Sequence, residues 1–338
     1  FVTELMSMKI LYACLKYDYG LKENGLNELA LNGFIPAFQR YSDLSCFYYD
    51  NYVFDKKTMS KKFNEVINIE NPSIIFIDNY LDIFDADFLL ELKKKYITVA
   101  WFGDDQWRFD SFSSNYANFY TAIVTTDKYS VSKYKKLGQK NVILSQWGVV
   151  DAPEVDMANT EYKYDLIFVG RIHPSRKWFV DQLSKLGFHV KVYGPGWENG
   201  KLPFNEFRNI GSNAKICLNI SNAVSYDIRH LSIKNPRSIS TMLRSEKMHN
   251  PTNARLMEIP YYGGFQLAEY GSPVEDYFNI GEDIVCYRSI NDAEILIRHY
   301  LENDIEREKI RLSGYKKSRQ RYSYNSIVKK IISDIDGL

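Results

Sequence analysis

The feature that most constrains the fold is a series of short, continuous apolar segments separated by stretches of helical periodicity. In the first half of the chain they lie at 9–14, 73–78, 97–102, 122–126 and 142–145, and 86–94 has a helical pattern. Strands that alternate with helices form parallel sheets. Strands that are apolar on both faces indicate a sheet covered on both sides. Residues 1–150 are therefore predicted to form one α/β domain.

The same pattern begins again after a polar segment at 151–163, which contains a proline and lacks periodicity. We interpret this segment as an interdomain linker. Further strands are expected at 166–169, 190–193, 214–220 and 284–287, and helices at 255–261 and 292–302. The prediction is an α/β protein with two Rossmann-like domains facing each other across a cleft, the second spanning 164–315. Such sheets bind ligands at the carboxyl ends of their strands, so residues that follow strands are the candidates for a site.

Charge and composition exclude several classes of protein. The 338 residues carry a formal net charge of +1, which gives no reason to expect nucleic acid as a partner. No apolar stretch approaches the length of a spanning helix. The four cysteines have no metal-ligand spacing, and Cys14, Cys217 and Cys286 lie in apolar runs as buried free thiols do. We expect a cytoplasmic protein without metal or transmembrane segment. The basic residues at 316–321 indicate either peripheral contact at the inner membrane face or a solvated helix face.

The first candidate site is the turn after the expected strand 166–169. Gly170 at the strand end lets the backbone approach a ligand closely. Basic residues placed to clamp a diphosphate are Arg171, Arg176 and Lys177. The alternative is a plain turn with solvated basic residues. After the next strand, Tyr193 and Gly194 are candidates for the edge of a nucleotide base, against the alternative of a tight turn.

The second candidate is the start of the helix expected at 255–261. Thr252 or Asn253 can cap this helix, and free backbone N–H groups near Arg255 attract phosphate. Glu258, one turn further on, is placed to accept hydrogen bonds from ribose hydroxyls. The alternative is a capped amphipathic helix with a solvent-facing glutamate.

The third candidate is the acidic pair Asp104 and Asp105, which follows the strand 97–102 between two tryptophans. One of the two is predicted to be a general base for a sugar hydroxyl, because adjacent side chains point apart. A carboxylate beside tryptophan can have a raised pKa. The competing interpretations are a metal-binding pair and a simple helix cap. A second acidic pair, Asp85 and Asp87, opens a helix and is interpreted as a cap.

The second half resembles the CgeB-like (spore maturation protein) glycosyltransferases, relatives of the GT-B family 1/4 group. The segments that carry the resemblance are FVGRIHPSRKWFVDQL at 168–183, VYGPGW at 192–197, AKICLNIS at 214–221, NARLMEIPYYGGFQLAEY at 253–270 and residues 278–310. The resemblance implies a GT-B fold whose C-terminal helix, 316–338, crosses back to the first domain. It also implies a UDP- or GDP-sugar donor on the second domain, bound without metal. The basic loop would face the diphosphate, Glu258 the ribose, and Tyr193-Gly194 the base.

The resulting hypothesis is transfer of a sugar to a hydroxyl of a glycan or other cell-surface precursor, with the acceptor on the first domain near 17–28 and 102–110. One departure from retaining relatives is Asn250, which stands where they carry an acid. The alternative to a retaining mechanism is therefore an inverting one, with Asp104 or Asp105 as the base. Two rival functions are a GT-B-type sugar-nucleotide epimerase and a non-catalytic binding subunit.

Overall fold

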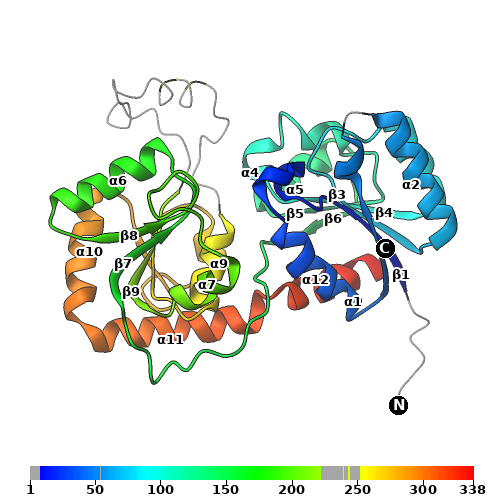
Figure 1. Cartoon of the computed structure of the whole chain (residues 1–338). Helices are drawn as coiled ribbons and strands as arrows, with labels where there is room; N and C mark the ends of the chain where they lie inside the picture. The colour runs from blue at the N-terminus through cyan, green and yellow to red at the C-terminus, as the bar shows by residue number, and fades with distance from the viewer. Residues whose placement is uncertain (1–7, 54, 222–238, 240–242, 244–251) are drawn as a thin grey trace, which may run out of the picture. The chain divides into compact units, whose positions relative to one another are not determined.

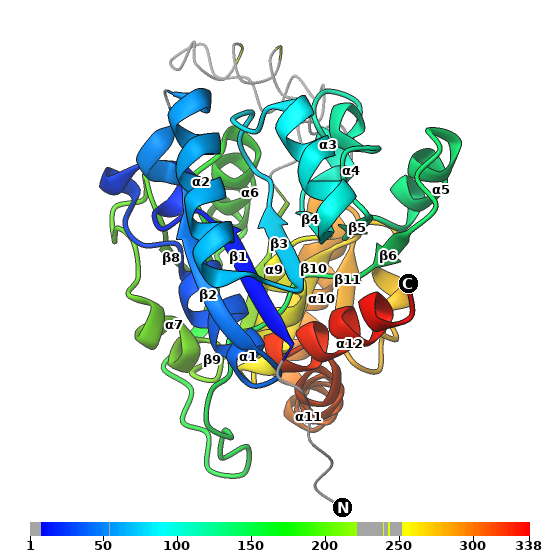
Figure 2. The same ribbon diagram turned by 90° about the vertical axis from the view of Figure 1, so that its right-hand side faces the viewer.

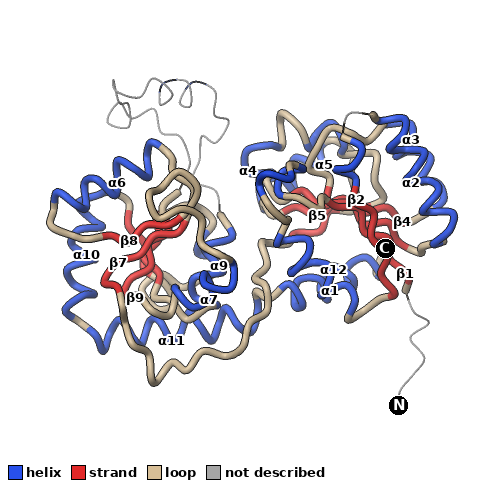
Figure 3. Tube along the Cα trace, viewed as in Figure 1, coloured by secondary structure: helices blue, strands red, loops and turns tan. Residues whose placement is uncertain are grey.

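A computed structural model of the chain describes residues 8–53, 55–221, 239, 243 and 252–338 (Figure 1). Asn250 lies outside these residues. The chain divides into two compact units: unit 1 comprises residues 1–151 and 323–338, and unit 2 comprises 152–322. Each unit contains one parallel sheet covered by helices (Figure 3). None of the helices in the described ranges is long and apolar enough to cross a membrane.

Unit 1 has a six-stranded parallel sheet in the order β2-β1-β3-β4-β5-β6. Its strands are β1 (Lys9–Cys14), β2 (Asp43–Tyr48), β3 (Ile74–Asp78), β4 (Ile97–Phe102), β5 (Ala122–Thr125) and β6 (Val142–Leu144). The five predicted strands are confirmed to within one residue at either end. The sequence did not predict β2, an edge strand in which Phe47 alone is fully buried.

Helices cover both faces of this sheet. On one face, Met59, Phe63 and Ile67 of α2 pack with strand residues that include Ile75 and Ile77. On the other face Phe34 and Phe38 contact Tyr12 and Phe76, and α12 packs beside α1 (Figure 2). The helices are η3 (Leu29–Phe34, a π-helix), α1 (Ile35–Gln39), α2 (Lys56–Glu70), α3 (Ala86–Lys95), α4 (Asp105–Arg108), α5 (Lys128–Lys136) and α12 (Tyr324–Asp336), with short 3-10 turns η1 (Asp18–Gly20), η2 (Lys22–Asn24), η4 (Tyr49–Tyr52) and η5 (Ser113–Tyr116).

Asp85 is the N-cap of α3 and accepts hydrogen bonds from the backbone N–H groups of Asp87 and Phe88. The interpretation of this acidic pair as a cap is therefore confirmed.

Unit 2 has a five-stranded parallel sheet in the order β11-β10-β9-β7-β8. Its strands are β7 (Tyr164–Val169), β8 (Val190–Tyr193), β9 (Ala214–Asn219), β10 (Gln266–Glu269) and β11 (Val285–Tyr287). In Figure 1 the strands lie between α6 and α10 on one side and α7 and α9 on the other. The helices are α6 (Pro174–Lys185), α7 (Phe204–Ile210), α9 (Ala254–Tyr261), α10 (Ile290–Glu302) and α11 (Asp304–Arg321), with a 3-10 turn η7 (Val274–Asp276).

Two expectations need correction. The basic tail is not one helix, because the chain breaks at Tyr322–Ser323, where Ser323 caps α12 by accepting from the N–H of Ser326. Cys286 is half-buried rather than buried, although all four cysteines are free thiols.

Candidate functional site

The turn after β7 is a tightly packed piece of backbone. The N–H of Gly170 donates to the carbonyl of Tyr193 at 2.9 Å, and the indole N–H of Trp197 donates to the carbonyl of Gly170 at 2.8 Å. Gly194 has φ +135°, and a Cβ there would lie 2.2 Å from the carbonyl oxygen of Gly170. Only glycine fits that position. The predicted Gly170 and Gly194 thus lie together at the carboxyl ends of the neighbouring strands β7 and β8.

Arg176, in the first turn of α6, connects this turn with the end of β9. Its Nε donates to the carbonyl of Ile220 at 2.9 Å and its Nη1 to the carbonyl of Arg171 at 3.0 Å. Burial and the nearby positive charge of Arg255 lower the pKa of Arg176 to about 10, while Glu269 acts in the opposite direction. The two guanidinium groups repel each other, so an anion bound beside them would be stabilising.

The first turn of α9 contributes the remaining cation. Of the two predicted caps, Thr252 and Asn253, the N-cap is Asn253, whose side chain accepts from the N–H of Leu256 at 3.2 Å. Arg255 donates through Nε to the carbonyl of Val169 at 3.2 Å and pairs with Glu258. Its guanidinium lies over the ring of Phe207 at 4.2 Å. Asn253, Arg255 and Glu258 therefore belong to the same strand-end cluster as Gly170.

The side chains of three predicted residues, Arg171, Tyr193 and Lys177, lie outside these contacts. Arg171 is exposed, so its side chain is free to reach a ligand. Tyr193 is half-buried at the end of β8, and its pKa is raised by burial and by a hydrogen bond with Tyr164. Lys177 is exposed and pairs with Asp181 one turn further along α6, with Nζ 2.9 Å from Oδ2. This pair is a solvated one on the helix surface.

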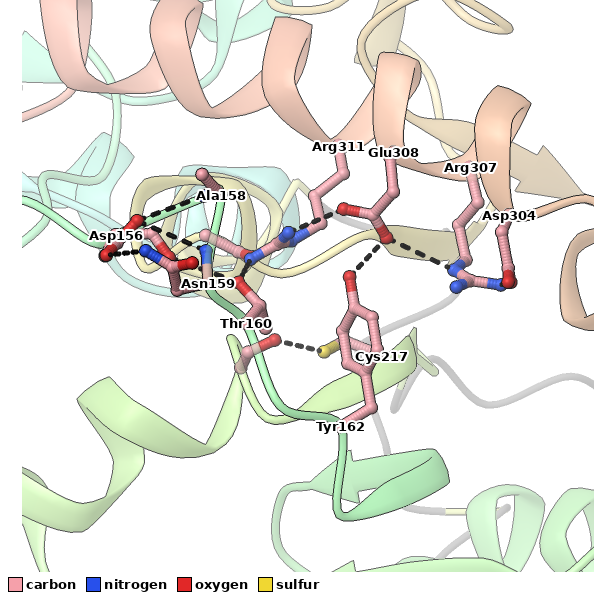
Figure 4. A network of polar contacts seen from close by, with 12 residues as sticks. Asp156, Ala158, Asn159, Thr160, Tyr162, Cys217, Asp304, Arg307, Glu308 and Arg311 are labelled. Carbon is pink, nitrogen blue, oxygen red and sulfur yellow. Dashed lines mark hydrogen bonds and ion pairs between the residues drawn. The ribbon is translucent and has the colours of Figure 1, made fainter.

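A buried arginine on α11, Arg311, holds the chain just beyond α9, and Figure 4 shows its contacts with Thr160 and Glu308. Arg311 is 1% exposed and donates to the carbonyl of Gly263 at 2.6 Å, to Thr160 Oγ1 at 2.8 Å and to Glu308 at 2.7 Å. Gly263 lies two residues beyond the end of α9, and the hydroxyl of Ser318 donates to the carbonyl of Met257 within that helix. Of the segment 151–163, which we expected to join two domains, all but Asp151 thus belongs to unit 2.

The acidic pair of unit 1 separates into a buried and a half-exposed residue. Asp105 is 2% exposed, and its Oδ2 accepts from Thr125 Oγ1 at 2.6 Å and from the hydroxyl of Tyr134 at 2.9 Å. Burial raises the pKa of Asp105 to about 6, with the hydrogen bonds acting against that rise. Asp104 is half-exposed and precedes α4 without a side-chain capping bond. Asp104 is therefore the acid that faces outward.

Sequence reasoning missed a further acid, Asp78, at the end of the neighbouring strand β3. Its backbone pairs in register with Trp101, and its carbonyl accepts from the hydroxyl of Tyr49 at 2.5 Å. Burial and the charge of Asp104 raise the pKa of the Asp78 carboxyl to about 7, and Arg108 opposes them. The signal was present, because Asp78 ends a predicted strand.

Aromatic rings adjoin these acids. The rings of Tyr19 and Tyr80 lie 5.6 Å apart, and the guanidinium of Arg108 lies 4.4 Å from the ring of Tyr80 and 4.1 Å from that of Phe112. Tyr19 is 51% exposed in a left-handed conformation, with φ 55°. Exposed aromatic rings beside carboxylates suit the apolar faces and hydroxyl groups of a sugar.

Across the described ranges, no group of three or more His, Cys, Asp and Glu side chains is arranged to hold a metal ion.

Comparison with known proteins agrees with this architecture. Residues 175–333 match the protein family described as glycosyl transferase-like. No curated protein matches the chain in sequence. HepE of Anabaena in complex with UDP-glucose superposes with a TM-score of 0.64 at 11% identity, over 98% of this chain and 100% of HepE.

Two further solved structures are similar. Sucrose-phosphate synthase from Thermosynechococcus elongatus has a TM-score of 0.65 at 9% identity, over 96% of this chain and 98% of that one. A putative UDP-N-acetylglucosamine 2-epimerase from Listeria monocytogenes has a TM-score of 0.56 at 10% identity, over 98% and 96%. At these identities the likeness concerns the fold. The chain has the two-domain, Rossmann-like GT-B fold, with one parallel sheet in each unit.

Proposed function

We propose that the chain is a glycosyltransferase that moves a sugar from a nucleotide diphosphate sugar to a hydroxyl acceptor, without a metal ion. The observation that carries the proposal is the cluster in unit 2 in which Arg176 and Arg255 lie together at the Gly170 turn and the start of α9. Fixed cations at this position would stabilise the negative charge that develops on the departing nucleotide diphosphate.

Each residue of the cluster has a role in the proposal. The backbone at Gly170 and the N–H groups after Asn253 receive phosphate oxygens. Arg171, which is exposed, and Arg176 and Arg255, which are held by carbonyl oxygens, supply charge; Lys177 contributes at longer range from the helix surface. Glu258 receives the ribose hydroxyls, and Tyr193 with Gly194 borders the base.

The acceptor is assigned to unit 1. Asp104, which is half-exposed, and Asp78 at the next strand end form a pair of carboxylates that can take the acceptor proton. Asp105 has a supporting role in this proposal, because its carboxylate is buried and bonded to Thr125 and Tyr134. A base of this kind corresponds to the inverting outcome.

The family match over 175–333 and the UDP-glucose complex of HepE favour a UDP-sugar, with a GDP-sugar as the second choice. A CgeB-like role in building a glycan or other cell-surface precursor belongs to the same proposal. It rests on the resemblance of the segments 168–183, 192–197, 214–221, 253–270 and 278–310 to that family.

Epimerisation of a nucleotide sugar is the second candidate, favoured by the likeness to the putative UDP-N-acetylglucosamine 2-epimerase. An epimerase would need the cluster of unit 2 but no external acceptor. The two activities therefore differ in their products.

Thermal-shift measurements with UDP, GDP, CDP, dTDP, ADP and their sugars, each with and without EDTA, test the donor site. A ligand that binds the folded state alone raises its stability. We expect a shift with one nucleotide that EDTA does not change and that Arg176→Met abolishes. Incubation with that sugar nucleotide and glycan acceptors should yield nucleotide and a glycosylated product. Absence of any shift would reject the donor site, and a new sugar nucleotide formed without acceptor would favour the epimerase.

A further inference from the structure

Positive charge is concentrated in the segment of unit 1 that forms α5 and β6. Between Asp127 and Asp151 the sequence contains lysines and no acidic residue. These lysines are Lys128, Lys133, Lys135, Lys136 and Lys140. The whole chain has a formal net charge of only +1, so this segment differs from the average surface and attracts anions.

The outward side of α5 combines these lysines with exposed apolar side chains. Residues spaced three, four, seven and eight apart lie on one side of a helix. Tyr129 at the start of that side is 52% exposed, and Leu137 at its end is 44% exposed. Tyr134, on the inward side, is part of the core. We call the outward surface the α5 face, made of Tyr129, Lys133, Lys135, Lys136, Leu137 and Lys140.

The charge of the α5 face is available to an external partner. Lys133 pairs with Asp110 at 3.4 Å, and the carboxylate of Asp110 is itself exposed. A surface pair of this kind is weak. Lys135, Lys136 and Lys140 are exposed, and none of the three has an ion-pair partner among the residues that the structure describes.

Neighbouring elements extend the α5 face. Asn118 joins the ends of α3 and α5, because its carbonyl accepts from Lys93 Nζ at 2.9 Å and its Nδ2 donates to the carbonyl of Leu137 at 2.8 Å. The basic last turn of α3, Lys93–Lys95, therefore lies next to the end of α5. On the other flank is β6, the edge strand beside α5 (Figure 2), whose Leu144 is 42% exposed.

The composition of the face indicates the kind of partner. All its basic residues are lysines, whose flexible stems carry a point charge, whereas arginine presents a fork that fits a single phosphate. Lysines mixed with exposed tyrosine and leucine are typical of helices that lie at a membrane surface. A diffuse anionic surface with an apolar interior therefore fits this face better than a nucleic acid does.

The basic residues at 316–321, which we first considered for membrane contact, are used inside unit 2. Lys317 Nζ lies 2.6 Å from Asp283 Oδ2, and Arg319 Nη1 donates to the carbonyl of Ala152 at 2.7 Å. The α5 face offers more charge to a partner than this segment does.

We propose that the α5 face docks unit 1 on an anionic lipid bilayer, with its lysines among the headgroups and Tyr129 and Leu137 at the boundary of the acyl chains. This inference goes beyond the proposed function, and the docking does not depend on sugar transfer. The start of α5 is held to the turn that carries Asp104, because Thr126 Oγ1 donates to the carbonyl of Gly103 at 2.6 Å. Docking through α5 would thus bring the proposed acceptor base near the lipid surface.

The test is co-sedimentation of the full chain with vesicles of phosphatidylcholine, alone or mixed with phosphatidylglycerol, at low and high salt. Lys135→Gln combined with Lys136→Gln removes charge from the face, and Leu137→Gln removes an apolar contact. Lys57→Gln combined with Lys61→Gln is the matched control, since both lysines are exposed on α2 of the same unit. A single-stranded oligothymidine serves as a second polyanion.

We expect binding to the anionic vesicles alone, and weaker binding at high salt. The double change on α5 should weaken it about 10- to 30-fold and Leu137→Gln about 3- to 10-fold, with the Tm unchanged and the α2 control as tight as the natural protein. Absence of binding to anionic vesicles would overturn the inference. So would an equal loss in the α2 control, a Leu137→Gln variant that binds as tightly as the natural protein, or tighter binding to oligothymidine than to vesicles.

Discussion

Arg255 pairs with the carboxylate of Glu258 one turn further along α9, while its Nε donates to the carbonyl of Val169 at 3.2 Å. The strand end of β7 and the start of α9 are therefore joined through one guanidinium. Glu258 thus has two candidate roles, binding the ribose of a nucleotide and holding Arg255 in place. Ligands with and without a ribose distinguish these roles.

Replacing Glu258 with alanine is expected to weaken nucleoside diphosphate binding about 10- to 100-fold, because the carboxylate proposed to bond the ribose hydroxyls is lost. Binding of inorganic pyrophosphate should stay the same or tighten, since Arg255 loses its internal partner. Titration calorimetry with both ligands makes the comparison. A parallel loss for pyrophosphate would mean that Glu258 only positions Arg255.

Arg311→Met is expected to lower the free energy of unfolding by about 3 kcal/mol. The change removes the donor to the carbonyl of Gly263, to the hydroxyl of Thr160 and to Glu308 Oε2, while Glu308 keeps its contacts with Tyr162 and Arg307. Arg298→Met is the control, because Arg298 is half-exposed and pairs with Glu294 on the same helix surface, a type of pair worth about 0–1 kcal/mol. Urea unfolding measures both variants. Equal effects would show that the network of Figure 4 adds nothing beyond a surface pair.

The sequence predicted the sheets well, because continuous apolar runs reveal strands that are buried on both faces. It missed β2, in which Phe47 is the one fully buried side chain. It also gave no sign that Arg307 and Arg311 of α11 are buried, at 2% and 1% exposed. A buried arginine and an exposed one look alike in sequence, because burial depends on carbonyls and carboxylates from distant segments.

The cluster of unit 2 was predictable where glycine and helix-cap chemistry mark it, as at Gly170, Gly194 and Asn253. The sequence could not predict which of Asp104 and Asp105 turns inward, because no periodic pattern distinguishes two adjacent acids. Asp78 could have been found by applying the strand-end rule to every predicted strand, because it is the last residue of β3. Glu269 could not, because it ends β10, and no predicted strand ended there.

Asp105→Asn should change the pH dependence of stability. The pKa of Asp105 is about 6 in the folded protein and about 3.9 in an unfolded chain. The folded state thus holds the proton of Asp105 more tightly than the unfolded chain does. The contribution of Asp105 to the free energy of unfolding is therefore greatest below pH 4 and is lost as the pH rises through 6. The asparagine variant lacks this loss, and its stability relative to the natural protein should rise by up to about 3 kcal/mol between pH 4 and 7.

Urea titrations at pH 4, 5, 6 and 7 measure this difference. The variant should also keep most of its transferase activity, since the buried carboxylate has a supporting role. A flat difference across pH would mean that Asp105 titrates normally. A loss of activity in a stable variant would return Asp105 to the position of catalytic base.

The pH profile of transfer should identify the base in unit 1. The pKa of Asp78 is raised to about 7 by burial and by Asp104, and Arg108 opposes the rise. Other titratable groups that interact with it are Cys14, Tyr12 and Tyr49, whose own pKa values are raised well above neutrality by burial. If Asp78 takes the acceptor proton, kcat/KM should increase as the pH rises through about 7 and then level off.

Asp104→Asn separates the two carboxylates. With Asp78 as the base, the variant should keep its rate at high pH and shift the inflection to lower pH, because a repelling charge has gone. With Asp104 as the base, kcat should fall about 10²- to 10⁴-fold at every pH. Asp78→Asn gives the converse pattern, and Asp110→Asn, at an exposed aspartate in unit 1, serves as the control. If both variants keep the natural profile, neither carboxylate removes the proton, and the retaining mechanism is favoured, since it needs no base on the acceptor side.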